Sequence, residues 1–487
     1  MRTTFGGAIA RIFNPSVLGL VVLPLLALAV FSFRNGQESI WNDEWFTINE
    51  IQQTDMVSFF KEIIHGENTP PLYYILLRWW SGNGRNLDAS YLRFLSAVFA
   101  AVAVGLTFWF GRALYGNQVG LIAGLLLASS PYLCWYGQEI RSLTLFAALS
   151  VLSMITFYSY AKHPGRLMRF IGAVIVMILG LYTHYFFVFL IPAQLLYARY
   201  FDDGRLFKRW FFGIIIAGTV FCLWMPALLG QLKLNRTFWL DPPEIVFGLQ
   251  VLANFSAGIF YHAHIHVSIF AALIFGILFF AGMVEFFTRP NAVSMKFFFT
   301  YQNMFLLIFM FVPVICPFIL SFFKPMLYEG KRYLIFLLPL FMIVVARGMC
   351  SFKNNRVITA LVIAVLCTNF VAVRQVHTRT QKRFWNKTSA ALKQLSEPGD
   401  AVFSTDYTQG KILTYYGLGN AELIAIPDIN TWKKQIRPFK RLWFITHIPN
   451  CRESQIFDQV LTRINERTLV SDEGNWLTVI LYDCSGI

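Results

Sequence analysis

Charged residues are scarce in this sequence: Asp, Glu, Lys and Arg make up only 14% of its 487 residues. A soluble domain carries nearer to a quarter, so this shortage excludes an ordinary soluble protein. Hydrophobic residues instead make up 56% of the chain. Apolar runs of about 20 residues recur, which is the length that crosses a bilayer as a helix, whereas a transmembrane β-barrel would show short alternating segments. The sequence therefore predicts a polytopic α-helical membrane protein.

Cysteine motifs are also missing. The seven cysteines form no CxxC and no Cys/His pattern with the spacing of a zinc site. Two of them, Cys451 and Cys484, lie in the tail, where they form either a disulfide, if the tail is exported, or two buried thiols. Internal repeats and low-complexity tracts are absent too. The sequence predicts no metal site.

Basic residues outnumber acidic ones by 41 to 26, which gives a net charge of +15. In a soluble protein this excess would indicate nucleic acid. Here the basic residues fall mostly in short loops between apolar runs, as they do in the cytoplasmic loops of membrane proteins, where anionic headgroups attract them. We therefore expect the lipid bilayer as a partner, and no nucleic acid.

Length and apolarity predict about eleven spans. The first, near 16–33, follows Arg2 and Arg11 with no convincing cleavage site after it, so we interpret it as a signal anchor that stays in the membrane. The other ten lie near 89–111, 117–133, 140–160, 168–182, 184–200, 210–230, 267–286, 302–323, 333–346 and 357–374.

Loop charge predicts the orientation of these spans. The basic segments fall on one side under this count; they are 162–169, 202–209, 288–296 and 347–356. The first loop, 34–88, falls on the other side and is acidic. By the positive-inside rule the N-terminus is cytoplasmic, and the first loop and the tail lie outside a plasma (inner) membrane.

Two amphipathic helices are expected within the first loop. "TDMVSFFKEII" (54–64) has one broad apolar face, with Thr54 as a plausible N-cap. "PPLYYILLRWW" (70–80) is aromatic and too short to cross a membrane. Both helices are predicted to lie on the outer membrane surface.

The composition changes near residue 375. An amphipathic helical pattern comes first, and strand-like runs follow at 401–406, 422–428, 441–447 and 476–483, separated by helical patterns. We predict two domains: a transmembrane domain over 1–374 and a small extracytoplasmic α/β domain over 375–487.

Ionisable residues near the membrane form a short list, because each one costs about 2.5–3.5 kcal/mol at the bilayer centre. Four clusters fall on the predicted outer side; they are Asp43 and Glu44, Glu139 and Arg141, His184, and Tyr328 with Lys331 and Arg332. Each has a plainer interpretation. Asp43 caps a helix, the basic residues snorkel to the interface, and His184 is a satisfied polar residue. Glu139 and Arg141 do not face each other on a helix, which disfavours a local ion pair.

These clusters occur in motifs whose order resembles a known family. Asp43-Glu44 is followed by "PPLYY" (70–74), "SSPYLCWYGQEIRSLTL" (129–145), "THYFFVFL" (183–190) and "KRYLIFLLPL" (331–340). The chain is similar here to the polyprenyl-phosphate-sugar glycosyltransferases of the GT-C fold, and most to glycosyltransferase family 39, which includes the protein O-mannosyltransferases, and to the related lipid A aminoarabinose transferases. In the latter a Lys precedes the Pro-Pro pair, where this chain has Thr69, which argues against a lipid A substrate.

The resemblance implies transfer of a sugar, with inversion, from a polyprenyl-phosphate donor to a hydroxyl on the outer side. Asp43 would be the general base, while Glu44 and Glu139 would position the acceptor or stabilise charge on the sugar. The donor phosphate and the substrate would be bound by Arg141, His184, Tyr328, Lys331, Arg332 and Tyr74. The acceptor would be a lipid, a glycan or a protein.

The chemistry of the transfer is consistent with these roles. One carboxylate takes the acceptor proton as an oxocarbenium-like state forms. The donor is a phosphodiester whose leaving phosphate needs positive charge, which arginine supplies in bidentate form. No cofactor is required by charge, although a divalent metal remains compatible. The alternative is a transporter or flippase of lipid-linked glycans, but such proteins tend to show duplicated halves and midplane polar residues.

Overall fold

The computed structural model describes residues 14–200, 204–233, 247–258, 265–288, 300–323, 332–379, 382–426, 432–448, 451–470 and 476–485. They fall into two compact units. The helical unit comprises residues 1–35 and 49–377, and the tail unit comprises 36–48 and 378–487. The short segment 36–48, which the sequence assigns to the first loop, thus groups with the tail.

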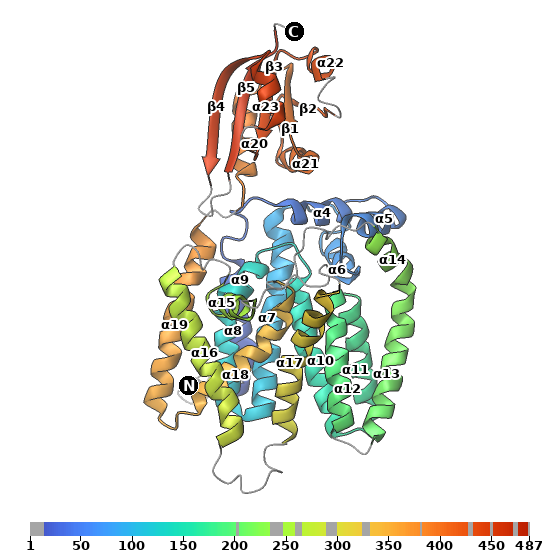
Figure 1. The fold of residues 1–487 in the computed structure, drawn as a ribbon, viewed down its shortest axis with the longest axis vertical. Coiled ribbons are helices and arrows are strands. Elements are labelled where there is room, and N and C mark those ends of the chain that lie inside the picture. The colour runs from blue at the N-terminus through green and yellow to red at the C-terminus, as the bar shows by residue number, and fades with distance from the viewer. Residues whose placement is uncertain are drawn as a thin grey trace, which may run out of the picture. The chain divides into compact units, whose positions relative to one another are not determined.

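Long apolar helices build the helical unit (Figure 1). Its elements are α2 Pro15–Val17, η1 Leu18–Val22, α3 Leu23–Ser32, α5 Met56–Gly66, α6 Leu72–Trp80, α7 Ala89–Tyr115, α8 Asn117–Ala128, α9 Pro131–Gly137, α10 Leu143–Lys162, α11 Leu167–Leu181, η2 Tyr185–Phe189, α12 Leu190–Tyr200, α13 Arg205–Phe221, η3 Cys222–Trp224, α14 Met225–Lys233, α15 Phe247–Ala257, α16 Ile265–Thr288, α17 Tyr301–Ser321, η6 Tyr333–Leu337, α18 Leu338–Cys350 and α19 Asn355–Thr378.

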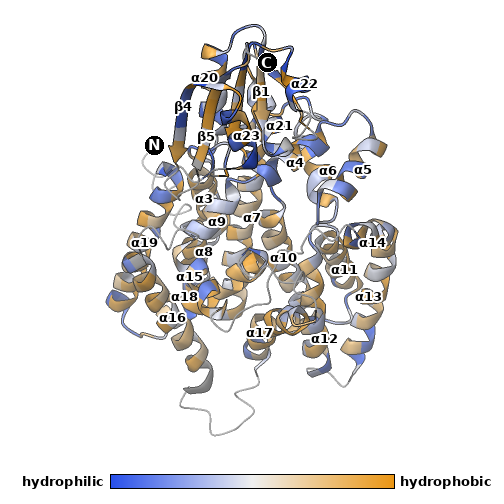
Figure 2. Ribbon diagram, turned by 45° about the horizontal axis from the view of Figure 1, so that its top comes forward, coloured by the Kyte–Doolittle hydropathy of each residue, from blue (hydrophilic) through white to orange (hydrophobic). Residues whose placement is uncertain are grey.

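The predicted spans coincide with helices. Eight of them, in the described part of the chain, are long and apolar enough to cross a membrane, and a ninth results if α8 and α9, bent by 55° at their junction, count as one. α11 has 15 residues and α12 has 11, so these two are shorter than a full span. Figure 2 shows that hydrophobic residues dominate this unit. The prediction of a polytopic helical membrane protein is confirmed, with an approximate span count.

Two glycines allow α16 and α18 to pack closely. A Cβ atom on Gly282 would clash with the carbonyl of Val344, and one on Gly348 would clash with the carbonyl of Leu278. Small residues of this kind let the backbones of membrane helices approach each other. α16 and α18 are thereby in direct backbone contact, although 49 residues separate the two helices along the chain.

The first loop forms α4 (Asn42–Ile51), α5 and α6. α5 begins one residue later than predicted: Asp55, not Thr54, is its N-cap and accepts hydrogen bonds from the backbone N–H groups of Val57 and Ser58. α6 is anchored through Arg78, whose Nη1 donates to the carbonyls of Ile51 and Gln53 at 2.8 and 2.6 Å. The expected short amphipathic helices are therefore present, and their ends are tied to one another.

The tail unit is a five-stranded mixed sheet with helices packed against it. Its elements are α20 Trp385–Leu395, β1 Asp400–Ser404, α21 Tyr407–Tyr416, β2 Glu422–Leu423, α22 Trp432–Ile436, β3 Arg441–Thr446, α23 Arg452–Asp458, β4 Thr462–Val470 and β5 Trp476–Asp483. The strand order is β2-β1-β3-β5-β4. β1 pairs in parallel with β2 and β3, and β5 pairs antiparallel with β3 and β4.

The core of the tail explains its two cysteines. Phe403, Phe444 and Tyr482 project from one face of the sheet into a buried cluster that also contains Cys451 and Cys484. Both cysteines are free. Of the two alternatives left open by the sequence, the structure has the buried thiols.

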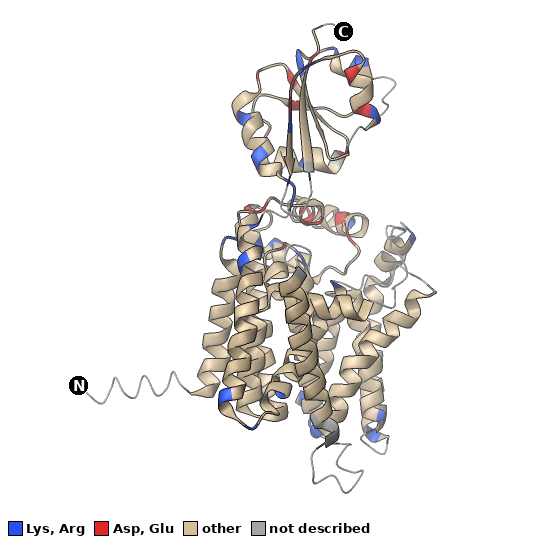
Figure 3. Cartoon of the chain, turned by 60° about the vertical axis from the view of Figure 1, so that its left-hand side comes forward, with Lys and Arg blue, Asp and Glu red and all other residues tan. Residues whose placement is uncertain are grey.

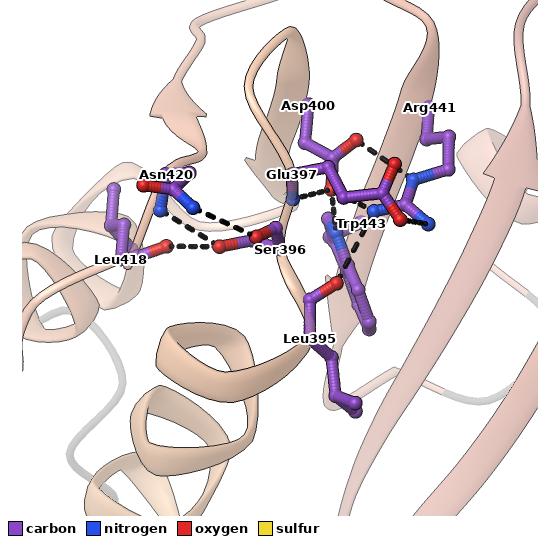
Figure 4. A network of polar contacts seen from close by, with 8 residues as sticks. All are labelled: Leu395, Ser396, Glu397, Asp400, Leu418, Asn420, Arg441 and Trp443. Atoms are coloured by element: carbon purple, nitrogen blue, oxygen red, sulfur yellow. Dashed lines mark hydrogen bonds and ion pairs between the residues drawn. The ribbon is translucent and has the colours of Figure 1, made fainter.

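On the same strands, Asp400 organises a polar network (Figure 4). Its carboxylate accepts hydrogen bonds from Arg441 Nε and Nη2, both at 2.8 Å, and from Trp443 Nε1 at 2.9 Å. The backbone N–H of Glu397 donates a further bond at 3.0 Å. This network fixes the start of β1 against β3.

Candidate active site

The predicted site residues divide between the two units. Tyr74, Glu139, Arg141, His184 and Arg332 lie in the helical unit. Asp43 and Glu44 lie in the tail unit. Tyr328 and Lys331 fall outside the described residues.

Arg141 forms a bidentate ion pair with Glu67, a residue that the sequence did not single out. Arg141 lies in the turn between α9 and α10, and Glu67 ends α5. Arg141 Nη2 donates to Glu67 Oε2 at 2.9 Å, and Nη1 donates to Oε1. The Glu67 side chain is buried, and that of Arg141 is partly buried. As the spacing of Glu139 and Arg141 indicated, the arginine pairs with a residue from another element.

Tyr74 lies beside this ion pair. Its hydroxyl is 2.6 Å from Thr69 Oγ1, and its ring is fully buried. Burial, followed by the negative charge of Glu67, holds the pKa of the Tyr74 phenol well above its ordinary value. The charges of Arg141 and Glu50 act on the same phenol. Tyr74 therefore stays protonated and is a neutral hydrogen-bonding group in a charged environment.

His184 has a buried nitrogen without a hydrogen-bond partner. It precedes η2, and its Nδ1 accepts the backbone N–H of Phe186 at 3.2 Å. The imidazole stacks on Phe146, with 4.5 Å between ring centres. Its Nε2 makes no hydrogen bond to any residue that the structure describes. Because a neutral imidazole has one donor and one acceptor nitrogen, the accepting Nδ1 assigns the proton to Nε2.

Two arginines lie near His184. The positive charges of Arg332 and Arg141 both interact electrostatically with its ring. Arg332 also acts on Tyr136, as does the buried Glu139. We call Glu67, Glu139, Arg141, His184 and Arg332 the charged cluster. The structure thus groups Glu139, Arg141, His184 and Arg332 as the sequence predicted, with Tyr74 at their edge.

The charged cluster offers more than one kind of chemistry. Glu67 neutralises Arg141 in the resting structure, and an arginine has five N–H groups of which a carboxylate occupies two. The Nε2–H of His184 adds a neutral donor. These groups suit a monoanionic oxygen ligand such as a phosphodiester. Within the described residues no group of three or more His, Cys, Asp and Glu side chains is arranged to hold a metal ion.

Basic residues occupy the opposite end of the helical unit. α10 runs from the turn of Arg141 to Lys162, and α11 runs from Arg166 to the turn of His184. A helix of 20 residues is about 30 Å long. Figure 3 shows the Lys and Arg residues at the helix ends. The charged cluster and the loop 162–169 therefore lie at opposite ends of α10 and α11.

Asp43 and Glu44 occupy the first turn of α4. α4 begins at Asn42, so Asp43 lies inside the helix and not at the capping position. Its side chain is half-buried. The Glu44 side chain is fully buried, and its Oε2 is 3.0 Å from Lys382 Nζ and accepts the backbone N–H of Trp41 at 3.3 Å. The two adjacent acids thus differ sharply in accessibility.

Glu67 and Lys382 were missed from the sequence for the same reason. Each resembles an ordinary loop charge, and its partner lies 74 or 338 residues away along the chain. The one available signal for Glu67 is its place directly before the Pro-Pro motif, in "ENTPPLYY".

Residues 70–229 match the family model of the dolichyl-phosphate-mannose-protein mannosyltransferases. This region contains Tyr74, Glu139, Arg141 and His184 of the site. The chain has the GT-C fold. The resemblance noted from the sequence, to the GT-C glycosyltransferases related to family 39, is confirmed by this match together with the structural comparisons that follow.

Two similar structures are those of ArnT from Cupriavidus metallidurans. The apo form has a TM-score of 0.59 and 12% identity, with 95% of this chain and 97% of ArnT covered. The form bound to undecaprenyl phosphate has a TM-score of 0.56 at the same identity, with coverages of 95% and 98%.

The archaeal oligosaccharyltransferase AglB from Archaeoglobus fulgidus, solved with an inhibitory peptide and a dolichol-phosphate, is also similar. Its TM-score is 0.50 at 12% identity, covering 89% of this chain and 69% of AglB. A comparison with curated proteins gave no match. At these identities the structures establish the fold, and the family match over residues 70–229 supports a membrane glycosyltransferase.

Proposed function

We propose that this GT-C protein transfers a sugar from a polyprenyl-phosphate donor to a hydroxyl acceptor on the outer face of the plasma membrane, with inversion. The observation that carries the proposal is the buried, unpartnered Nε2–H of His184, whose ring lies near enough to Arg141 and Arg332 to experience both positive charges. A buried donor without a partner costs about 1–3 kcal/mol, and an anionic ligand would recover this energy.

The donor phosphate is the anion that fits this place. After transfer the leaving group is a polyprenyl phosphate, so negative charge grows on its oxygens as the glycosidic bond breaks. Arg332 and the Nε2–H of His184 would face these oxygens, and Arg141, held in place by Glu67, would contribute its remaining N–H groups. Interactions that strengthen as charge develops accelerate the reaction. The relatives solved with undecaprenyl phosphate and with dolichol-phosphate support a lipid phosphate as the ligand.

Asp43 is the proposed general base. Of the Asp-Glu pair, Glu44 is fully buried and bound to Lys382, so an acceptor cannot reach it, whereas the Asp43 side chain is half-buried. A carboxylate that removes the acceptor proton while phosphate leaves from the opposite face of the sugar gives inversion in one displacement. Glu139 would position the acceptor or stabilise charge on the sugar.

Loop charge supports the outer face as the place of reaction. Lys162, Arg166 and Arg169 lie at the end of α10 and α11 opposite to the charged cluster. By the positive-inside rule these residues are cytoplasmic, which makes the charged cluster and the first loop extracytoplasmic. We also propose that no metal is needed, because the donor phosphodiester carries one negative charge, and Arg141, Arg332 and the Nε2–H of His184 can stabilise the second charge that develops on the leaving phosphate. Activity should therefore persist in EDTA.

One assay tests the proposal and separates it from a transporter. The purified protein in detergent is mixed with a polyprenyl-phosphate sugar that carries a radiolabel on the sugar, and candidate acceptors are added. Release of the label from the lipid, with an Asp43→Asn variant as the inactive control, is the expected result. A transporter or flippase would leave the labelled lipid intact. Absence of release with every acceptor class would overturn the proposal.

A further inference from the structure

The segment that contains Asp43 is bound by the tail. Residues 36–48 form one compact unit with 378–487. A short run of the first loop is therefore held by a domain that the chain reaches only after its last span. The contacts within this unit show how it is held.

The segment has two anchors in the tail, one through its backbone and one through a side chain. The N–H of Ile40 donates to the hydroxyl of Tyr416 at 2.8 Å. Ser39 Oγ donates to Asn386 Oδ1 at 2.8 Å and accepts the backbone N–H of Asn386 at 3.1 Å. Ser39 and Ile40 are both buried. These bonds fix the chain just before α4 begins.

Lys382 supplies the third anchor. Its Nζ lies 3.0 Å from Glu44 Oε2, and both side chains are buried. Its ammonium also lies 5.9 Å from the ring centre of Trp41, and its backbone N–H donates to Glu38 Oε2 at 3.1 Å. One residue of the tail thus contacts three side chains of the segment.

Fixing Glu44 also fixes its neighbour. Successive residues of a helix project about 100° apart from one axis, so the direction of the Asp43 side chain follows from that of Glu44. A catalytic group that is misplaced by about 1 Å can lose 10²-fold in rate. A general base on a short helix at the start of a loop needs such a restraint.

We propose that the tail acts as a clamp on the catalytic segment, with Lys382 as its principal positioning residue. By clamp we mean Lys382, Asn386 and Tyr416. Glu44 is then the attachment point of the clamp and not a group that touches substrate. The inference rests on the proposed role of Asp43 as base, and it gives the tail a function in the reaction.

The decisive variant is Lys382→Met in the full-length protein. It leaves the Glu44 carboxylate buried without its cation, which destabilises such sites strongly. Because Asp43 is displaced while the charged cluster is intact, kcat should fall by about 10- to 100-fold, and the KM for the donor should stay within a factor of about two. Hydrogen–deuterium exchange in residues 36–48 should become faster.

Three further variants separate clamping from loss of folding. Lys382→Arg keeps the charge and should restore most of kcat. The double variant Glu44→Gln with Lys382→Met removes both charges and should be less impaired than Lys382→Met alone, because no buried charge is left unpaired. Tyr416→Phe removes one hydrogen bond and should lower kcat and speed the exchange of residues 36–48 by less than Lys382→Met does. It tests the clamp even if Lys382→Met fails to fold.

Lys387→Met is the matched control. Lys387 is an exposed lysine in α20, five residues after Lys382, and its substitution should leave both kcat and exchange unchanged. Unchanged exchange of residues 36–48 in Lys382→Met and Tyr416→Phe would overturn the clamp. This readout needs no substrate, so it decides the clamp even if the wild-type protein fails to release sugar from the lipid, which would instead refute the proposed function.

Discussion

Each unit of this protein contains an ion pair that involves a buried glutamate from the first loop, and the two pairs differ in their cation. In the helical unit, Arg141 binds both carboxylate oxygens of Glu67. In the tail unit, the Lys382 ammonium binds a single oxygen of Glu44. The planar guanidinium has N–H groups to spare, whereas an ammonium is a compact point charge.

This difference suits the two cations to two roles: Arg141 to binding a substrate phosphate, and Lys382 to holding the segment that contains Asp43. Arg141 can keep its glutamate and still present N–H groups to a phosphate, so its pair suits the proposed substrate site. Lys382 packs near Trp41 and is itself buried, so its pair has a holding role. Loss of Arg141 should therefore affect donor binding, and loss of Lys382 should affect turnover. The predictions below test this division, beginning with the largest expected effect.

Asp43→Asn should have the largest effect. The Glu44–Lys382 pair only holds the segment in place, and the carboxylate of Asp43 acts as the proposed base. Removing that carboxylate should abolish general-base catalysis, which is typically worth about 10²–10⁴-fold. The kcat should fall by this factor while expression, donor KM and the exchange of residues 36–48 stay as in the wild type. Steady-state transfer kinetics measure kcat and the donor KM, and hydrogen–deuterium exchange measures the state of residues 36–48. Full activity in this variant would remove Asp43 as the base.

Arg141→Met should come next. Breaking a buried ion pair from one side destabilises a protein by about 3–5 kcal/mol, so the midpoint of thermal unfolding should drop and donor binding should be lost. The double variant Glu67→Gln with Arg141→Met should regain stability but not donor binding. The matching double variant of the tail, Glu44→Gln with Lys382→Met, should improve stability and turnover together. If both double variants regained function together with stability, or neither did, then the two ion pairs would not differ in role.

His184→Ala should have an intermediate effect, confined to the binding of the donor. A hydrogen bond to a charged group contributes about 1.5–3 kcal/mol, so the KM for the polyprenyl-phosphate donor should rise by roughly 10- to 100-fold. His184→Gln, which retains an N–H donor, should recover part of this loss. Titration of the detergent-solubilised protein with undecaprenyl phosphate gives the affinity without turnover. An unchanged affinity would exclude His184 from the phosphate site.

The smallest effect is expected for the Asp400–Arg441 pair, a bidentate arginine pair without a substrate role. Burial acts to raise the pKa of Asp400, but hydrogen bonds from Arg441, the Glu397 N–H and Trp443 outweigh it and hold the pKa below its ordinary value. Because the pKa of Asp400 is lower in the folded tail than in the unfolded chain, the carboxylate stabilises the folded tail at pH values above its pKa in the unfolded chain. This stabilisation is lost as the pH falls through the pKa of Asp400 in the folded tail. Asp400→Asn should destabilise the tail by about 1 kcal/mol.

The control for this prediction is the pH dependence itself. Thermal unfolding of the wild type should show a loss of tail stability in acid that is smaller in Asp400→Asn, while sugar transfer at neutral pH and room temperature is unaffected. A large loss of transfer in this variant would show that bidentate arginine pairs in the tail also serve catalysis.

Much of the fold could be predicted because it depends on long apolar runs. The helices α7, α10, α16, α17 and α19 lie where the hydrophobic sequence placed them. β4 was missed because it is an exposed edge strand, paired only with β5, and its residues, such as Arg463, Glu466 and Arg467, have no apolar alternation. Such charges keep an edge strand from pairing with other chains, and they also hide it from a reading of the sequence.

The site residues could be predicted where they belong to a recognisable sequence motif. Glu139 and Arg141 share one turn, and His184 lies in an aromatic motif, so each could be named from the sequence. Glu67 and Lys382 could not, because their burial arises from tertiary contacts over long distances along the chain. The charge of Lys382 falls within the basic run "RTQKR" after a span, where it looks like an ordinary interfacial residue.

The separation between Glu44 and Lys382 has a consequence for biosynthesis. The two residues are 338 positions apart, and at about 5–20 residues per second a ribosome needs roughly 20–70 s to pass from one to the other. During that time every span after the first is made, yet the loop that bears Asp43 lacks its partner. With the proposed roles of Asp43 and of the tail, a nascent or prematurely ended polypeptide would carry an unfinished reaction centre and would become active only as translation ends.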